Sequence, residues 1–233
     1  MATSDIRTED VSFASNGDTA HGYLARPAGD GPFPAIVVIQ EWWGLDQHIK
    51  DLAERFAQEG FVALAPDLYH GQVATEPDDA RKLVMALNGP IALREIGGAI
   101  GYLSDLPEVA PKSVGVIGFC MGGRLSLAAA STGDQRIGAA AAFYGGGVQP
   151  TAEFVGGIKA PVLAVYGEDD AGIPPEQYNG LAAEMDRQEK TFDMVVYPGA
   201  GHAFLNDTRP AYNANAAADA WARAVQWFHT YLA

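Results

Sequence analysis

The stretch that decides the fold lies at residues 114–123 and reads VGVIGFCMGG. Its short, unbroken apolar run predicts a strand covered on both faces, as in a parallel sheet. The run leads into the pattern glycine, any residue, nucleophile, any residue, glycine, and a helical pattern follows at about residues 121–132. This arrangement is typical of a nucleophile elbow, with Cys120 where serine is commoner.

The glycines beside Cys120 have a physical reason. A sharp strand-to-helix turn forces the nucleophile into strained backbone and brings neighbouring backbone close, so a side chain two residues away would clash. Gly118 and Gly122 occupy these two places. The turn also sets the sulfur at a helix N-terminus, where the dipole favours a thiolate. A lone cysteine is more often a small buried hydrophobe, but this context favours a nucleophile.

Strand and helix patterns alternate along the rest of the chain. The first 26 residues predict an antiparallel hairpin that turns at Asn16-Gly17. Further strands are expected at about 35–40, 61–65, 137–143, 161–166 and 191–197, and further helices at about 46–60, 78–88, 90–105, 175–187 and 213–231. Such alternation predicts an α/β fold with a mostly parallel central sheet and helices on both faces. No linker or repeat is visible, so residues 1–233 are expected to form one domain.

Composition narrows the class of protein. The 233 residues are 48% apolar and 19% charged, which excludes a disordered chain. The formal net charge of −14 argues against nucleic acid and anionic membranes as partners. A single cysteine allows no intrachain disulfide, and the first residues lack the apolar stretch of a signal peptide. We therefore expect a cytoplasmic protein, and no cluster of His, Cys and Asp has the spacing of a metal site.

A thiol nucleophile needs a base, and the chain has five histidines. His202 follows a late predicted strand in a loop and is the candidate. His21 lies in the hairpin, while His48 and His229 are expected to be solvated on polar helix faces. His70 lies in a loop and is not excluded.

The orienting acid is sought in GEDDAGIP at residues 167–174, where a predicted strand ends. Hydrolases of this architecture often carry Gly-x-x-Asp-x-x-apolar-Pro here, and this spacing selects Asp170 over Glu168 and Asp169. A solvated acidic turn is the alternative for three adjacent acids. The chain order nucleophile, acid, histidine is the one that such folds use.

The segment QEWWG at residues 40–44 follows the first buried strand. The backbone N–H groups of Trp42 and Met121 are predicted to form an oxyanion hole, because the loop after this strand and the residue after the nucleophile supply its donors. Glu41 is a candidate to accept the thiol proton. The alternative is a surface glutamate at a strand end.

Together these motifs resemble those of the dienelactone hydrolase (carboxymethylenebutenolidase) family, cysteine members of the α/β-hydrolase fold. The resemblance covers nearly the whole chain and rests on QExxG at 40–44, APDLY at 65–69, GxCxGG at 118–123, FYG at 143–145, the Asp170 turn and GHAF at 201–204. It implies a triad of Cys120, Asp170 and His202. It also implies a regulatory Glu41, which in the family holds the resting thiol until substrate displaces the carboxylate. The implied reaction is hydrolysis of dienelactone to maleylacetate in the breakdown of chloroaromatic compounds.

The substrate-binding positions depart from the family pattern. Its best-known members bind the substrate carboxylate with two arginines, one of them two residues after the His-x-Phe motif. That place holds Asn206 here, and the nearest arginine is Arg209. Arg81 is the candidate for the second arginine. Trp43 and Tyr144 are candidates to line an apolar pocket, with plain core packing as the alternative.

The expected chemistry is attack of the Cys120 sulfur on a small lactone or ester, followed by hydrolysis of an acyl-thioester, without a cofactor. One alternative is a broad carboxylesterase or thioesterase. Another is a hydrolase-like protein that binds a small molecule, or senses oxidants through its cysteine, without turnover. The protein is expected to be a monomer or a weak homodimer.

Overall fold

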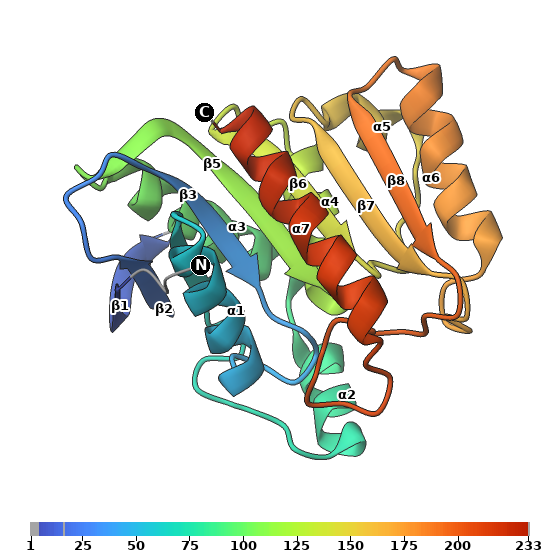
Figure 1. Cartoon of the computed structure of the whole chain (residues 1–233), viewed down its shortest axis with the longest axis horizontal. Coiled ribbons are helices and arrows are strands. Elements are labelled where there is room, and N and C mark those ends of the chain that lie inside the picture. The colour runs from blue at the N-terminus through green and yellow to red at the C-terminus, as the bar shows by residue number, and fades with distance from the viewer. Residues whose placement is uncertain (1–4, 16, 233) are drawn as a thin grey trace.

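The structure, a computed structural model, describes residues 5–15 and 17–232 and contains one eight-stranded sheet (Figure 1). The strand order is β1-β2-β4-β3-β5-β6-β7-β8. The strands are β1 (Ile6–Ser15), β2 (Asp18–Pro27), β3 (Phe33–Ile39), β4 (Val62–Pro66), β5 (Val109–Phe119), β6 (Ile137–Phe143), β7 (Val162–Gly167) and β8 (Phe192–Tyr197). Strands β3 to β8 are parallel, while β2 pairs antiparallel with both β1 and β4. The predicted fold class and the N-terminal hairpin are confirmed, although Asn16 of the predicted turn lies outside the described residues.

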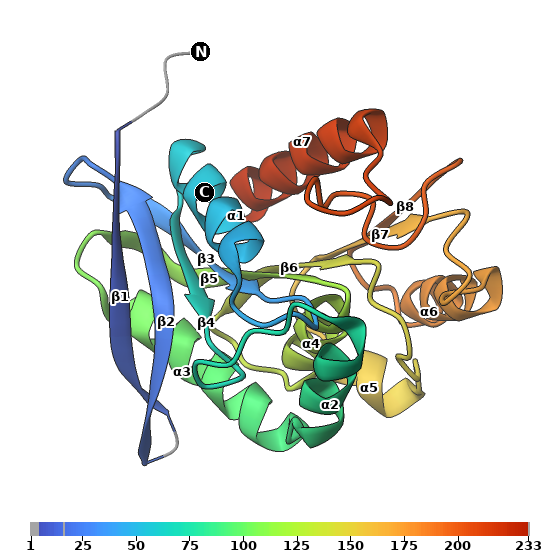
Figure 2. The same ribbon diagram turned by 90° about the horizontal axis from the view of Figure 1, so that it is seen from below.

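Helices cover both faces of the sheet. They are α1 (Gln47–Gln58), α2 (Pro77–Ala86), α3 (Gly89–Asp105), α4 (Met121–Ser131), α5 (Ala152–Gly157), α6 (Pro175–Arg187) and α7 (Ala214–Tyr231). Figure 2 shows α1 and α7 on one side of the sheet, with α3 and α5 on the other. Among the described residues no single helix has the length and hydropathy to cross a membrane, and α2 and α3 meet that test only as a pair bent by 87°.

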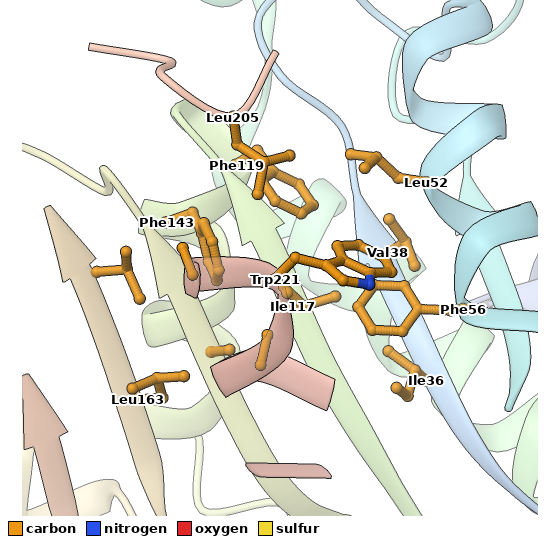
Figure 3. Close-up of a cluster of buried hydrophobic side chains, with 14 of the residues drawn as sticks. Ile36, Val38, Leu52, Phe56, Ile117, Phe119, Phe143, Leu163, Leu205 and Trp221 are labelled. Carbon is orange, nitrogen blue, oxygen red and sulfur yellow. The ribbon is translucent and has the colours of Figure 1, made fainter. Parts of the chain in front are cut away.

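Side chains along each strand point alternately to the two faces of the sheet, so each face has its own hydrophobic core. Ile36 and Val38 of β3 pack beneath α1 and α7, whereas the intervening Val37 packs beneath α3. In the core beneath α1 and α7, shown in Figure 3, the rings of Phe56 and Trp221 lie 4.4 Å apart and join the two helices. Burial of each such large apolar side chain stabilises the fold by roughly 1.5–3 kcal/mol.

Three local features differ from the sequence predictions. Helix α5 lies in a segment for which no helix was predicted, because its six residues are too few to show a period. Strand β5 begins at Val109 rather than 114, since polar residues interrupt its apolar pattern. The expectation that His48 is solvated is wrong. The connection between β8 and α7 covers it, with Asp207 3.7 Å away, and the side chain is buried.

The elbow is a crossing of three backbone segments. Cys120, between β5 and α4, has a φ of +55°, a value that costs about 1–3 kcal/mol for a residue with a side chain. A Cβ at Gly118 would lie 2.0 Å from the carbonyl oxygen of Gly122, and a Cβ at Gly122 would lie 2.4 Å from that of Ile39. Both glycines therefore allow a backbone approach that a side chain would prevent, as the sequence predicts.

We expect Gly118→Ala to destabilise the protein by at least about 2 kcal/mol, because backbone cannot yield as a flexible side chain does. The measurement is the free energy of unfolding in urea. Gly97→Ala is the matched control. Gly97 lies inside α3 with no atom within 4 Å of an added Cβ, so alanine there should stabilise by up to about 1 kcal/mol. A Gly118→Ala protein as stable as wild type would contradict this description of the elbow.

Candidate active site

Three side chains from separate strand ends form a continuous hydrogen-bonded row. Cys120 follows β5, Asp170 follows β7 and His202 follows β8. The Cys120 sulfur lies 3.1 Å from Nε2 of His202, and Nδ1 of His202 lies 2.6 Å from Oδ2 of Asp170. The carboxyl ends of parallel strands share one edge of the sheet, which brings residues 82 and 32 positions apart together. The order of contacts is that of a nucleophile, a base and an orienting acid.

Electrostatics favour a charged imidazole in this row. Burial by itself lowers the pKa of His202, but the hydrogen bonds to Asp170 and Cys120 and the charges of these groups outweigh it and raise the pKa to about 10. Asp170 is 4% exposed, and its other oxygen accepts a hydrogen bond from the Gly172 N–H at 2.9 Å. The carboxylate is thus fixed from two sides. The His202 side chain remains 40% exposed and Cys120 is half-buried, so neither side chain is sealed in the interior.

The two backbone N–H groups that the sequence predicts as oxyanion-hole donors belong to Trp42, in the loop after β3, and to Met121 at the start of α4. Met121 is the first residue of α4, so its N–H has no acceptor within the helix. The Trp42 N–H makes no backbone hydrogen bond within the described chain. The loop that carries Trp42 is held by the buried side chain of Gln40, whose Oε1 accepts from the Leu68 N–H at 3.1 Å. Both N–H groups are therefore free to bind a developing negative charge.

Glu41 is buried rather than a surface residue at a strand end, with 2% of its area exposed. Burial, aided by the charge of Asp46, raises the pKa of Glu41 to about 7, although the hydrogen bond from Asn206 and the charges of His202 and Arg209 lower it. Its Oε2 accepts from Nδ2 of Asn206 at 2.7 Å. Its Oε1 is buried without a hydrogen-bond partner among the described residues. The carboxyl group thus changes charge near neutral pH.

Asn206 is a residue of this site whose role the sequence does not reveal, because its position shows only that an expected arginine is absent. The side chain is fully buried, and Oδ1 accepts hydrogen bonds from the backbone N–H and the hydroxyl of Thr208, at 3.0 and 2.6 Å. The Asx-like pattern Asn-x-Thr is a local signal for such bonds. Nothing in the sequence points to the partner, Glu41, which is 165 residues away.

The predicted substrate-binding residues divide into two groups. The Arg209 guanidinium lies 3.8 Å above the ring of Trp43, which is itself buried. Tyr144 is fully buried beside the site. Burial and then the charges of Glu41 and Cys120 hold the pKa of its hydroxyl well above the ordinary range. Arg81 lies on α2, faces solvent and pairs with Asp78 at 3.0 Å. The structure therefore places the ring of Tyr144 5.3 Å from that of His202 and the charge of Arg209 near Glu41, while Arg81 pairs on the surface.

The other histidines lie elsewhere. His21 contacts Ser12 on the exposed hairpin, and His229 is exposed on α7. His70 contacts Glu95 at 2.8 Å. Within residues 5–15 and 17–232, no group of three or more His, Cys, Asp or Glu side chains has the arrangement of a metal site.

The fold and this row of residues define an α/β hydrolase that acts on carboxylic esters or lactones. The family model "Dienelactone hydrolase family" matches residues 20–232, and the chain belongs to that family.

Relatives and solved structures agree with this assignment. A protein of Synechocystis sp. named "Putative carboxymethylenebutenolidase" is 35% identical, with 99% of each chain covered. The crystal structure of a "Putative Dienelactone Hydrolase" from Klebsiella pneumoniae is 32% identical, covers 97% of this chain and 100% of its own, and has a TM-score of 0.89. A dienelactone hydrolase-like promiscuous phosphotriesterase from metagenomic libraries is 27% identical, covers 98% and 99%, and has a TM-score of 0.87.

Because Glu41 is buried, its ionisation is expected to lower the free energy of unfolding as the pH rises. The pKa in the folded protein, about 7, exceeds the ordinary 4.5, so this group's contribution to stability is full below pH 4.5 and is lost as pH rises through 7. Glu41→Gln removes the titration. The variant should therefore gain about 2–3 kcal/mol relative to wild type between pH 5 and pH 9.

The measurement is urea unfolding of both proteins at the two pH values. Glu153→Gln, at an exposed position on α5, is the control and should show no such pH-dependent gain. A difference between wild type and Glu41→Gln that is equal at both pH values would contradict a buried carboxyl that ionises near neutrality.

Proposed function

We propose that the protein hydrolyses small lactones and esters through a Cys-His-Asp triad and an acyl-thioester intermediate. The observation that carries the proposal is the contact row in which the Cys120 sulfur, the His202 imidazole and the Asp170 carboxylate lie at 3.1 and 2.6 Å. These are hydrogen-bonding distances, and each group has the chemistry of its role.

The mechanism follows from the positions of these groups. The Cys120 thiol gives its proton to His202, the sulfur attacks the substrate carbonyl carbon, and the carbonyl oxygen becomes negative between the N–H groups of Trp42 and Met121. The C–O bond to the leaving group then breaks, the leaving oxygen takes the proton from His202, and an acyl group stays on Cys120. Water, which gives a proton to His202, attacks the thioester and releases the acid and the free sulfur. Asp170 keeps the imidazole oriented and its charge balanced throughout.

The proposed substrate is a lactone of the dienelactone type, hydrolysed to maleylacetate. An enolate leaving group needs little help from an acid, which suits a thiolate nucleophile. Arg209 is the proposed partner for a substrate carboxylate, because its charge reaches the site and its guanidinium stacks on Trp43. Such an arginine must supply the attraction locally, since the chain as a whole carries a charge of −14.

A broader carboxylesterase is the second candidate. Asn206 replaces one expected arginine and is committed to Glu41, while Arg81 pairs with Asp78 on the surface. A site with one cation in place of two binds an anionic substrate less selectively. This arrangement supports activity on neutral esters beside any activity on dienelactone.

Replacement of the nucleophile tests the function. Cys120→Ala should lower the initial rate of hydrolysis by at least about 1,000-fold on a panel of cis- and trans-dienelactone and p-nitrophenyl esters, because it removes the attacking atom. Cys120→Ser should also be severely impaired, since a hydroxyl is far harder to ionise than a thiol. A Cys120→Ala protein that keeps most of its activity would refute the covalent mechanism.

Selectivity tests the role of Arg209. In Arg209→Gln, the ratio of kcat/KM for an ester with a free carboxylate to that for its neutral analogue should fall about tenfold, as expected for one lost charged hydrogen bond. The same ratio in Arg81→Gln serves as the comparison and should change less. An unchanged ratio in Arg209→Gln would assign carboxylate recognition to another group or to none.

A further inference from the structure

Tyr69 contacts both segments that carry the proposed oxyanion-hole donors. It follows β4 in the connection to α2, and its side chain is buried. Its hydroxyl donates a hydrogen bond to the thioether sulfur of Met121, at the start of α4, across 3.3 Å. The side chain of Trp42, in the loop after β3, packs against the same apolar cluster that holds Tyr69 and Met121. One tyrosine therefore lies where the two segments meet.

The connection that carries Tyr69 is also fastened to the backbone of the loop after β3. The N–H of Ala74 donates to the carbonyl oxygen of Trp43 at 2.8 Å. A Cβ added at Gly44 would lie 3.3 Å from Cδ2 of the Tyr69 ring, so the ring lies directly against this loop. These contacts flank Trp42 and make the loop and the connection one packed unit.

The hydroxyl joins this unit to α4. Its bond to Met121 is the only side-chain hydrogen bond that Tyr69 makes within residues 5–15 and 17–232. A thioether is a weak acceptor, but a buried hydroxyl with no acceptor at all is less favourable. Burial, and then the charge of Cys120, hold the pKa of Tyr69 above its ordinary range, so the hydroxyl stays a donor at neutral pH.

Met121 depends on such a contact because of its place in the helix. The N–H of the first helical residue has no acceptor within the helix, so no helical hydrogen bond fixes its direction. The position of this N–H is then set by the elbow and by what holds the Met121 side chain. Within the described chain, the hydroxyl of Tyr69 is the only hydrogen-bond partner of that side chain.

We propose that Tyr69 is a positioning residue of the oxyanion hole, whose bond to the Met121 thioether fixes the N–H of Met121 relative to that of Trp42. In this role the tyrosine acts through the backbone donors rather than on the reacting atoms. The inference rests on the proposed function, because the oxyanion forms only when the Cys120 sulfur attacks a carbonyl. Loss of the bond should weaken the transition state more than substrate binding.

Two single variants test the proposal by removing one end of the bond each. Tyr69→Phe keeps the ring and removes the donor, and Met121→Leu keeps the volume and removes the acceptor. We expect kcat on p-nitrophenyl esters to fall about tenfold in each, with KM within about twofold, because a displaced oxyanion-hole donor loses part of its effect. The double variant should be no slower than the slower single variant, since the bond is already absent in each.

A second readout needs no turnover. A phenyl trifluoromethyl ketone accepts the Cys120 sulfur at its carbonyl carbon, and its oxygen becomes negative as in the transition state. Its dissociation constant, measured by fluorine NMR, should rise about tenfold in Tyr69→Phe. Tyr102→Phe is the matched control. It removes the hydroxyl of a half-buried tyrosine that packs 5.9 Å from Phe13 on α3, and should keep the wild-type kcat and ketone affinity.

Three outcomes would overturn the proposal. The first is a Tyr69→Phe protein with the wild-type kcat and ketone affinity. The second is a rise in KM at unchanged kcat, which would make Tyr69 a substrate-binding residue. The third is losses that multiply in the double variant, which would mean that the two side chains act separately.

Failure of this inference is distinguishable from failure of the proposed function. If Cys120→Ala keeps its activity, the proposed function is wrong, and the affinity of the wild-type and Tyr69→Phe proteins for the ketone still decides the role of Tyr69. If hydrolysis requires Cys120 while Tyr69→Phe is fully active, only the present inference is wrong.

Discussion

The close backbone contact at the elbow is the constraint on which the rest depends. Gly122 packs against the carbonyl groups of Ile39 and Gln40, so the first turn of α4 touches the end of β3. This contact sets the start of α4 beside the loop that follows β3, and Cys120 at the turn has a strained φ of +55°. A looser crossing would move the proposed oxyanion-hole donors relative to the sulfur, and a group that is misplaced by an ångström loses much of its catalytic effect.

The site joins segments that are far apart in sequence but near in the sheet. Asp170 and His202 come from the ends of β7 and β8, and their contact requires only that neighbouring parallel strands keep register. The rigid sheet thus orients the imidazole before a substrate arrives. Glu41, just after β3, and Asn206, in the connection after β8, form a second joined pair, and the raised pKa of Glu41, about 7, makes its charge depend on pH near neutrality.

Sequence patterns predict the strand alternation, the elbow and the family, because each depends on local spacing. The burial of His48 and the bond from Asn206 to Glu41 depend on how the long connection after β8 folds back onto α1 and β3. The sequence of this connection has no hydrophobic periodicity, so its residues resemble ordinary polar loop residues. Helix α5 is missed for a related reason, since its short length leaves packing rather than pattern to define it.

Strand β6 has a consequence for the whole architecture. Its residues 139–142 are all alanine, two facing α7 and two facing the layer of α4 and α5. These small side chains let helices pack closely on both surfaces of β6, which pairs with the strand that carries the elbow. All four are fully buried, so a larger residue at any of them would have to displace packed neighbours on one face of the sheet.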